Sequence, residues 1–140
     1  MNIKEAVEKR FLVKEKLEKD LIDKEIKESA YDSQRAQKAF EEKDYKWAII
    51  QCYYSMFHAA KAVCFTLGYR EKKHFALVII LEELSNVGKL EQEYVNYFKA
   101  AIDSREEADY HYNYSQDIAE HSLKMAFSFN ERMKELIKEM

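Results

Sequence analysis

Residues that break helices are scarce in this chain of 140 residues, which contains no proline and only 2 glycines. β-Sandwiches and barrels need many tight turns, and those turns draw heavily on glycine and proline, so such folds are excluded. The composition, 47% hydrophobic and 35% charged, is instead typical of amphipathic helices. We expect an all-α protein with one domain, residues 1–140, folded as an antiparallel bundle of about five helices.

Cysteine is scarce as well, because Cys52 and Cys64 are the only two. They lie in the most apolar segment and form no C-x-x-C pair, which argues against a disulfide framework and against a zinc site. Two buried free thiols are the expected state. That state fits a reducing compartment, so the predicted localisation is cytoplasmic.

Long apolar runs and an excess of positive charge are missing too. The apolar stretches are interrupted by polar residues, and the first residues lack the apolar core of a signal peptide, so neither a membrane span nor export is expected. The net charge is -3, which argues against binding nucleic acid through bulk charge and confines any RNA contact to a local cationic site. No residue pattern requires a metal or other cofactor, and we expect none.

Apolar residues recur at helical spacing along most of the chain. The predicted helices cover residues 3–42, 44–67, 71–87, 90–110 and 115–138. A break near residues 12–15 would leave a short separate N-terminal helix, and the sequence leaves this alternative open. The second helix has Asp44 as a suitable N-cap and Gly68 as a left-handed C-cap. Because it is apolar or small on nearly every face, we expect it at the bundle centre or against a second copy.

The end of the fourth helix is the most informative segment for function. It carries a permanent cation, Arg105, and a titratable imidazole, His111. Held together, these groups can bind a phosphodiester and move its protons. A straight helix would turn the two side chains about 120° apart, so the chain must bend between them. Asn113 and Gln116 resemble a capping pair that opens the last helix, and this junction at residues 110–114 would supply the bend.

Two interpretations of Arg105 follow from its place on the inward-facing line of its helix. An inward cation needs an anion or other acceptors. Asp109, one helical turn further on, can hold Arg105 in a structural ion pair, or a phosphate can displace Asp109 and make Arg105 part of a site. The neighbouring Tyr110, Tyr112 and Tyr114 can stack on the bases of single-stranded RNA. Packing in the interior or in a dimer contact is the alternative for at least one of them.

A dense cationic cluster lies at the start of the third helix. It consists of Arg70, Lys72 and Lys73, followed by His74. Such a cluster at a helix start can bind phosphate, which makes Arg70 and His74 candidate substrate contacts. The alternative is a solvated loop. On the apolar second helix, by contrast, His58 is expected to be a hydrogen-bonded core histidine rather than a metal ligand.

Two motifs carry a resemblance to a known family. Residues 44–62 resemble the pattern D-Y-x-x-A-x-x-x-x-Y-Y-x-M-F-H-A-A-x-A, and residues 105–110 are similar to R-x-x-A-D-Y. Both patterns are those of the HEPN domain, a small helical bundle often encoded beside a minimal nucleotidyltransferase. The resemblance is clearest over residues 24–140.

The resemblance implies more than a fold. Many HEPN proteins use an R-x4-6-H motif for metal-independent RNA cleavage, with two copies facing each other across a homodimer. Arg105 and His111, with five intervening residues, fit this spacing and are the implied catalytic pair. The implied function is binding of RNA or a nucleotide in a dimer cleft, with endoribonuclease activity of the toxin–antitoxin type. The alternative is a noncatalytic interaction module or nucleotide-binding partner of a nucleotidyltransferase.

Overall fold

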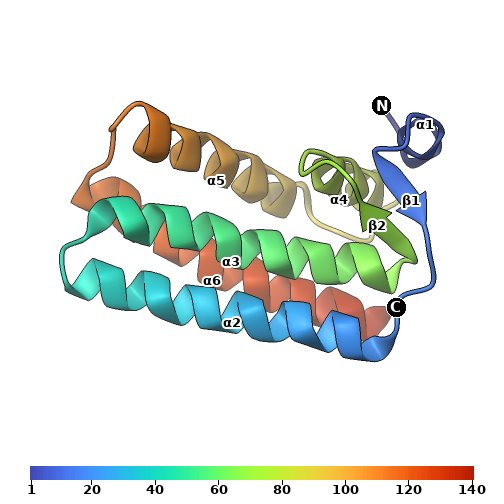
Figure 1. Ribbon diagram of the computed structural model, residues 1–140, viewed down its shortest axis with the longest axis horizontal. Helices are drawn as coiled ribbons and strands as arrows, with labels where there is room; N and C mark the ends of the chain where they lie inside the picture. Colours follow the sequence, from blue (N-terminus) through green and yellow to red (C-terminus); the bar gives the residue numbers. More distant parts are fainter.

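The computed structural model describes all 140 residues and contains six α-helices and two short β-strands (Figure 1). Along the chain these are α1 Ile3–Glu8, β1 Leu12–Lys14, α2 Lys19–Glu41, α3 Tyr45–Thr66, β2 Tyr69–Glu71, α4 Ala76–Asn86, α5 Gln92–Tyr110 and α6 Gln116–Glu139. The long helices α2, α3, α5 and α6 form a bundle, and α1, α4 and the two strands lie at one end of it (Figure 1). The predicted all-α helical bundle is confirmed.

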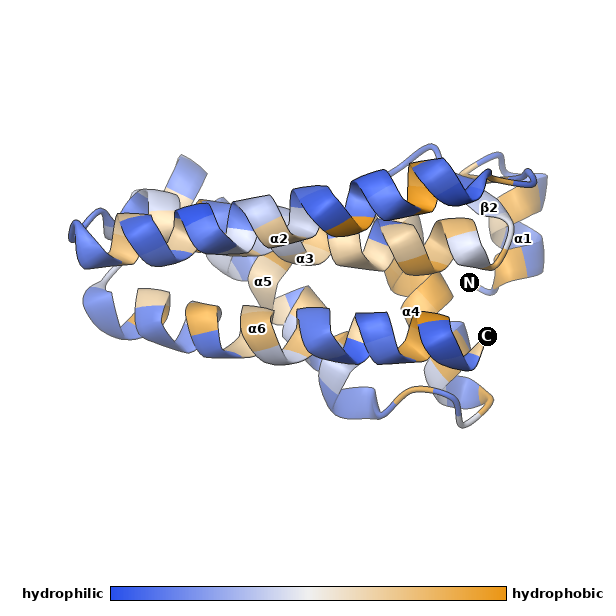
Figure 2. Cartoon of the chain, turned by 90° about the horizontal axis from the view of Figure 1, so that it is seen from below, coloured by the Kyte–Doolittle hydropathy of each residue, from blue (hydrophilic) through white to orange (hydrophobic).

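Helix α3 is the centre of the bundle, because it packs against α2, α5 and α6. Both predicted caps are present: the Asp44 side chain accepts a hydrogen bond from the Trp47 N–H at 3.3 Å, and Gly68 has φ +89°. In Figure 2, α2 is largely hydrophilic while α3 behind it is largely apolar. The apolar composition of α3 is thus explained by its central position within a single chain.

The open question about the N-terminal arm is answered by a break. Arg10 has φ +60°, and β1 follows and pairs antiparallel with β2. This pairing also corrects the expected start of the third helix, because Glu71 lies opposite Leu12 in the ladder and α4 begins only at Ala76. Strands β1 and β2 form a two-stranded ribbon, which backbone hydrogen bonds extend at both ends. The Lys72 N–H donates to the Phe11 carbonyl, and the Glu15 N–H donates to the Gly68 carbonyl.

The junction between α5 and α6 lies where it was predicted, but a different residue caps α6. Ser115 is the N-cap, and its hydroxyl accepts a hydrogen bond from the Ile118 N–H at 3.2 Å. Asn113 instead closes the end of α5, since its N–H donates to the Glu107 carbonyl at 2.9 Å. Asn113 lies close to the end of α5 because the chain reverses direction at Tyr112, which has φ +55°. The predicted Asn113–Gln116 capping pair was therefore wrong.

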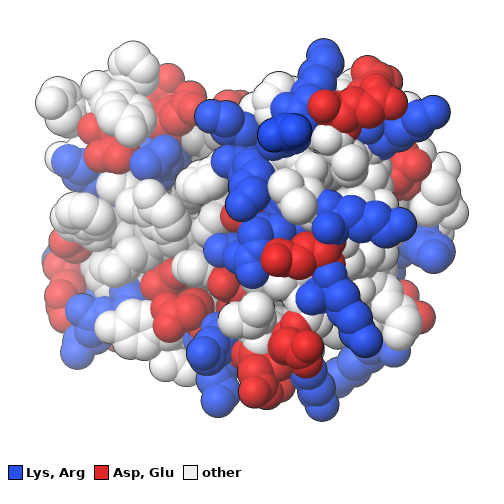
Figure 3. Space-filling view, turned by 45° about the vertical axis from the view of Figure 1, so that its right-hand side comes forward, with Lys and Arg blue, Asp and Glu red and all other residues white.

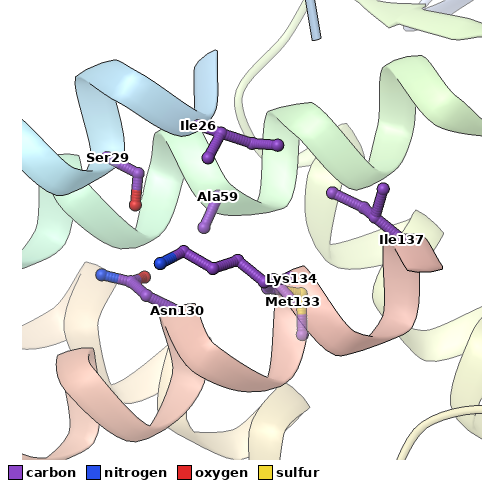
Figure 4. Close-up of a pocket in the computed structure, with 7 residues that line it drawn as sticks. All are labelled: Ile26, Ser29, Ala59, Asn130, Met133, Lys134 and Ile137. Atoms are coloured by element: carbon purple, nitrogen blue, oxygen red, sulfur yellow. The ribbon is translucent and has the colours of Figure 1, made fainter. Parts of the chain in front are cut away.

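A small cavity lies where α2, α3 and α6 meet (Figure 4). Its volume is about 10 Å³, which is close to the space that one water molecule needs. Asn130 lines it and donates a hydrogen bond at 3.2 Å to the buried Ser55 hydroxyl, which in turn donates to the Cys52 carbonyl at 2.8 Å. This cavity is a packing feature of the bundle, too small for a substrate.

Candidate functional site

Arg105 lies in the second half of α5 and is surrounded by tyrosines. Its Nη2 donates a hydrogen bond to the Tyr54 hydroxyl at 3.2 Å. The guanidinium carbon lies 5.6, 5.7 and 5.5 Å from the ring centres of Tyr53, Tyr54 and Tyr110. Cations are attracted to aromatic faces at this range. The arginine side chain is 24% exposed, so it is held in place yet still reachable from solvent.

Asp109 does contact Arg105, as one of the two interpretations requires. The distance from Nη2 to the Asp109 Oδ2 is 3.6 Å, longer than the roughly 2.7–2.9 Å of a strong charge-assisted hydrogen bond. The Arg105 Nε is buried and has no hydrogen-bond partner. Burial disfavours the charge of Arg105, but Tyr54, Tyr110, Tyr53 and Asp109 outweigh it and raise its pKa. The result is a permanent cation held among tyrosines.

His111 caps the C-terminal end of α5. Its backbone N–H donates to the Glu107 carbonyl at 3.2 Å, and its side chain is exposed. The side chains of Arg105 and His111 make no hydrogen bond or ion pair with each other, because Arg105 turns toward α3 and His111 stands at the open end of the helix. Within one chain, therefore, Arg105 and His111 lie on the same segment but their side chains do not interact.

The three tyrosines of the α5–α6 junction are all exposed. The exposed fractions are 61% for Tyr110, 74% for Tyr112 and 44% for Tyr114. Tyr110 packs beside Arg105, while the ring of Tyr112 has the Lys46 ammonium 5.6 Å from its centre. The junction therefore lies next to the first turn of α3, and interior packing does not account for any of these tyrosines.

Tyr54, which accepts the hydrogen bond of Arg105, belongs to a partly exposed line on α3 that motif reading did not single out. The line consists of Trp47, Gln51, Tyr54, His58 and Lys61, which are separated by three or four residues and none of which is buried. On a helix this spacing places side chains on one face. The regular spacing was a usable signal, but the surrounding apolar residues concealed it.

His58 connects this line to α2. Its Nδ1 lies 2.6 Å from the Glu25 Oε2, and its Nε2 lies 3.6 Å from the Asp32 Oδ2. The predicted hydrogen-bonded histidine is confirmed, although it lies at a helix seam rather than in the core. Burial alone would raise the pKa of Glu25, but the hydrogen bond from His58 and the charge of Lys61 outweigh it and lower that pKa. For Asp32 the effect of burial is larger than that of the His58 charge, and the pKa of Asp32 is raised.

The cationic cluster of the ribbon is not joined to Arg105. The Arg70 Nε donates to the Glu15 Oε2 at 2.6 Å across the ribbon. His74 lies in the loop before α4, with its ring centre 4.6 Å from that of Phe57, and not inside a helix as expected. Figure 3 shows lysine and arginine side chains gathered over this end of the molecule, interspersed with acidic ones. Arg70 and His74 thus belong to a separate surface.

Neither cysteine is placed for chemistry. Both Cys52 and Cys64 are buried and free, as predicted, and burial raises the pKa of each thiol to about 12. The structure brings together no group of three His, Cys, Asp or Glu side chains suited to a metal ion. None of its helices combines the length and the apolar character that crossing a membrane requires.

Comparison with known proteins agrees with the fold and with the two motifs. Residues 22–136 match the HEPN domain, and the chain belongs to the HEPN domain family. This match includes the Arg105–His111 segment and the whole partly exposed line of α3.

Two relatives illustrate the similarity. The chain is 33% identical over 106 residues to a "UPF0332 protein" of Archaeoglobus fulgidus, covering 74% of this chain and 85% of that protein. It is 31% identical over 103 residues to a protein of Methanocaldococcus jannaschii named "Putative toxin MJ0605", covering 72% of this chain and 77% of that protein.

Proposed function

We propose that this chain is a toxin-type HEPN ribonuclease that cleaves RNA without a metal ion, with Arg105 and His111 as its catalytic residues. The observation that carries the proposal is the state of Arg105. It is fixed by Tyr54 and by aromatic faces, its contact with Asp109 is long, and its side chain is still 24% exposed. A cation that is positioned in advance and has free donors suits the extra charge of a phosphoryl transition state.

The chemistry requires one proton to be removed and one to be supplied. An imidazole takes the proton of a ribose 2′-hydroxyl as its oxygen attacks the adjacent phosphorus, and a second imidazole gives a proton to the departing 5′-oxygen. The products are a 2′,3′-cyclic phosphate and a 5′-hydroxyl. The Arg105–His111 motif supplies one imidazole per chain, so the two imidazoles come from two copies of the chain.

A homodimer also resolves the separation within one chain. Because Arg105 and His111 do not contact each other in the monomer, a twofold pairing of the α5 ends would bring the histidine of one copy toward the arginine of the other. Sedimentation at micromolar concentration tests this step. A dimer is expected, and a protein that stays monomeric would remove the composite cleft.

Other contacts to RNA fall into two groups. The exposed rings of Tyr112 and Tyr114 are available to stack on unpaired bases beside the catalytic pair. Arg70 and His74, with the exposed Lys72 and Lys73, would contact phosphates of a longer strand at the ribbon end. These accessory contacts are part of the proposal.

The direct experiment is cleavage of total RNA in the presence of EDTA. The variants Arg105→Ala and His111→Ala are each expected to lower the rate by about 10²-fold or more. His121→Ala is the matched control, since His121 is an exposed histidine on α6 that is not part of the Arg105–His111 segment. Cleavage that proceeds unchanged in both variants would rule out this catalytic pair.

A second candidate function is a noncatalytic module that docks a nucleotidyltransferase. The exposed Tyr110, Tyr112 and Tyr114 favour it, because clustered exposed tyrosines are common at protein interfaces. Isothermal titration with a minimal nucleotidyltransferase would measure the affinity. Binding that is lost in Tyr112→Ala, together with no RNA cleavage by the unaltered protein, would favour this second function.

A further inference from the structure

A pocket opens at the turn between α2 and α3, next to the catalytic segment. Its volume is about 210 Å³, and its lining consists of Arg35, Lys38, Ala39, Glu42, Asp44, Trp47 and Gln51. Gln51 precedes Tyr54 by three residues on α3, so the pocket lies on the same helix face as the hydroxyl that holds Arg105. The pocket and the Arg105 site are therefore neighbours along one line.

Trp47 gives this pocket an aromatic wall. It is the only tryptophan of the chain, and 52% of it is exposed although the next three residues are buried. Its backbone is fixed by the Asp44 cap. A large, exposed and anchored ring is a stacking platform of the kind that single-strand-binding proteins use for bases.

Gln51 gives the pocket an unmet hydrogen-bonding need. Its Oε1 is buried and has no partner. Burial of an unpaired acceptor is unfavourable, so a turn of the Gln51 side chain that brings this oxygen to a ligand N–H group in the pocket gains affinity. Glu42 adds a second acceptor on the lining. The pocket thus selects for donors on the edge of a ring that lies against Trp47.

Cations complete the rim on the α2 side. Arg35 and Lys38 are exposed, and neither forms an ion pair. Their charge suits a phosphate that stays outside the pocket. The volume is below the roughly 300–1,000 Å³ of sites for drug-sized ligands, so one ring system fits inside while a sugar and phosphate remain at the rim.

We propose that this pocket is a nucleobase subsite. The base stacks on Trp47, its exocyclic amino group donates to the Gln51 Oε1, and its phosphate meets Arg35 or Lys38. Uracil fits less well, because its single ring N–H is flanked by two carbonyl oxygens that would face the oxygens of Gln51 and Glu42. The pocket therefore prefers an amino-bearing base such as adenine. That the natural ligand is a base of an RNA strand rests on the proposed function.

The experiment uses the fluorescence of Trp47, which reports from the pocket without interference from another tryptophan. The full chain is titrated with AMP and with UMP, neither of which contains a phosphodiester bond that the proposed nuclease could cleave. AMP is expected to quench the emission saturably and to bind roughly 10-fold more tightly than UMP. Absence of quenching by AMP, or equal affinities for the two nucleotides, would overturn the proposal.

Variants assign the effect to the pocket. Gln51→Leu is expected to weaken the binding of AMP by about 10-fold and to remove the preference for AMP over UMP. Gln34→Leu, an exposed glutamine of α2 outside this lining, should leave both affinities unchanged. A Gln51→Leu variant that is folded by circular dichroism and still distinguishes the nucleotides would refute the role of Gln51.

The outcomes also separate this subsite from the nuclease. If AMP quenches Trp47 selectively but the unaltered protein cleaves no RNA, the subsite stands and the proposed function fails. If RNA is cleaved but AMP gives no quenching, the nuclease stands and the subsite is refuted.

Discussion

Arg105 of α5 donates a hydrogen bond to the hydroxyl of Tyr54 on α3, across 51 positions of sequence. This bond attaches the most informative segment of the chain to the central helix of the bundle. The arginine is thereby oriented by a rigid element rather than by the α5–α6 junction that follows it.

Removing the Tyr54 hydroxyl should loosen Arg105 without removing its charge. Tyr54→Phe keeps the aromatic face but loses the acceptor, so we expect about 0.5–1.5 kcal/mol less stability in urea unfolding. RNA cleavage should fall, but less than in Arg105→Ala. Tyr45→Phe is the control, because Tyr45 packs on Phe40 and its hydroxyl has no partner in the chain. Unaltered stability and cleavage in Tyr54→Phe would contradict this role.

Asp109 decides between a structural ion pair and an active site. Its contact with Arg105 is long and one third of its side chain is exposed, so Asp109→Asn should change stability by no more than about 1 kcal/mol. If phosphate displaces Asp109, removing its charge should leave RNA affinity equal or higher. Filter binding with the His111→Ala background measures this. A large loss of both stability and RNA affinity would show that Asp109 is required to hold Arg105.

The seam between α2 and α3 should respond to pH through Glu25. Its pKa is lowered in the folded chain, so its interactions stabilise the fold above the ordinary value of 4.5 and are lost as the pH falls through the lower folded pKa. Glu25→Gln should therefore destabilise by about 1–3 kcal/mol at neutral pH and by much less in acid. Urea midpoints over this pH range test the expectation. A difference that does not change with pH would contradict it.

Asp32 should behave in the opposite way, although it faces the same histidine. Burial raises its pKa, and the charge of His58 offsets this only in part. A raised folded pKa means that ionisation of Asp32 at neutral pH opposes folding. Asp32→Asn is thus expected to leave the urea midpoint unchanged or to increase it. A marked decrease at neutral pH would show that the contact with His58 outweighs burial.

The end of α3 depends on a backbone conformation that glycine adopts freely. A Cβ on Gly68 would lie 3.8 Å from the Glu15 carbonyl oxygen, an ordinary contact, so Gly68→Ala should be penalised only through its φ of +89°. We expect a loss of about 1–2 kcal/mol in thermal or urea unfolding. Gly88→Ala, with φ +79° and open space around it, should lose a similar amount. A much larger loss at Gly68 alone would point to packing rather than conformation.

Local signals in the sequence were enough to predict the long helices and the caps of α3. Asp44 and Gly68 act on their own neighbours, and apolar spacing repeats within each helix. The ribbon could not be predicted, because its strands are three residues long and Leu12 pairs with a partner 59 positions away, Glu71. Such short strands are defined by pairing between distant segments rather than by their own composition.

The candidate site was predictable in its residues but not in its surroundings. The R-x5-H spacing and the inward direction of Arg105 are local properties of one helix. The tyrosines that hold the guanidinium come from α3, and the pocket at Trp47 is closed by α2. Only the packing of three helices brings them together. The capping pair failed for a related reason, because both Asn113 and Ser115 were suitable caps and the chain reversal at Tyr112 selected Ser115.

The central claim is a catalytic cleft that needs the His111 of two copies, and subunit mixing tests it most directly. Unaltered protein is unfolded, refolded with an equal amount of His111→Ala protein, and assayed for RNA cleavage with EDTA. If only dimers with two intact histidines are active, random pairing predicts roughly one quarter of the activity that the same total amount of unaltered protein shows. Roughly one half of that activity would mean that each chain works independently and would contradict the composite cleft.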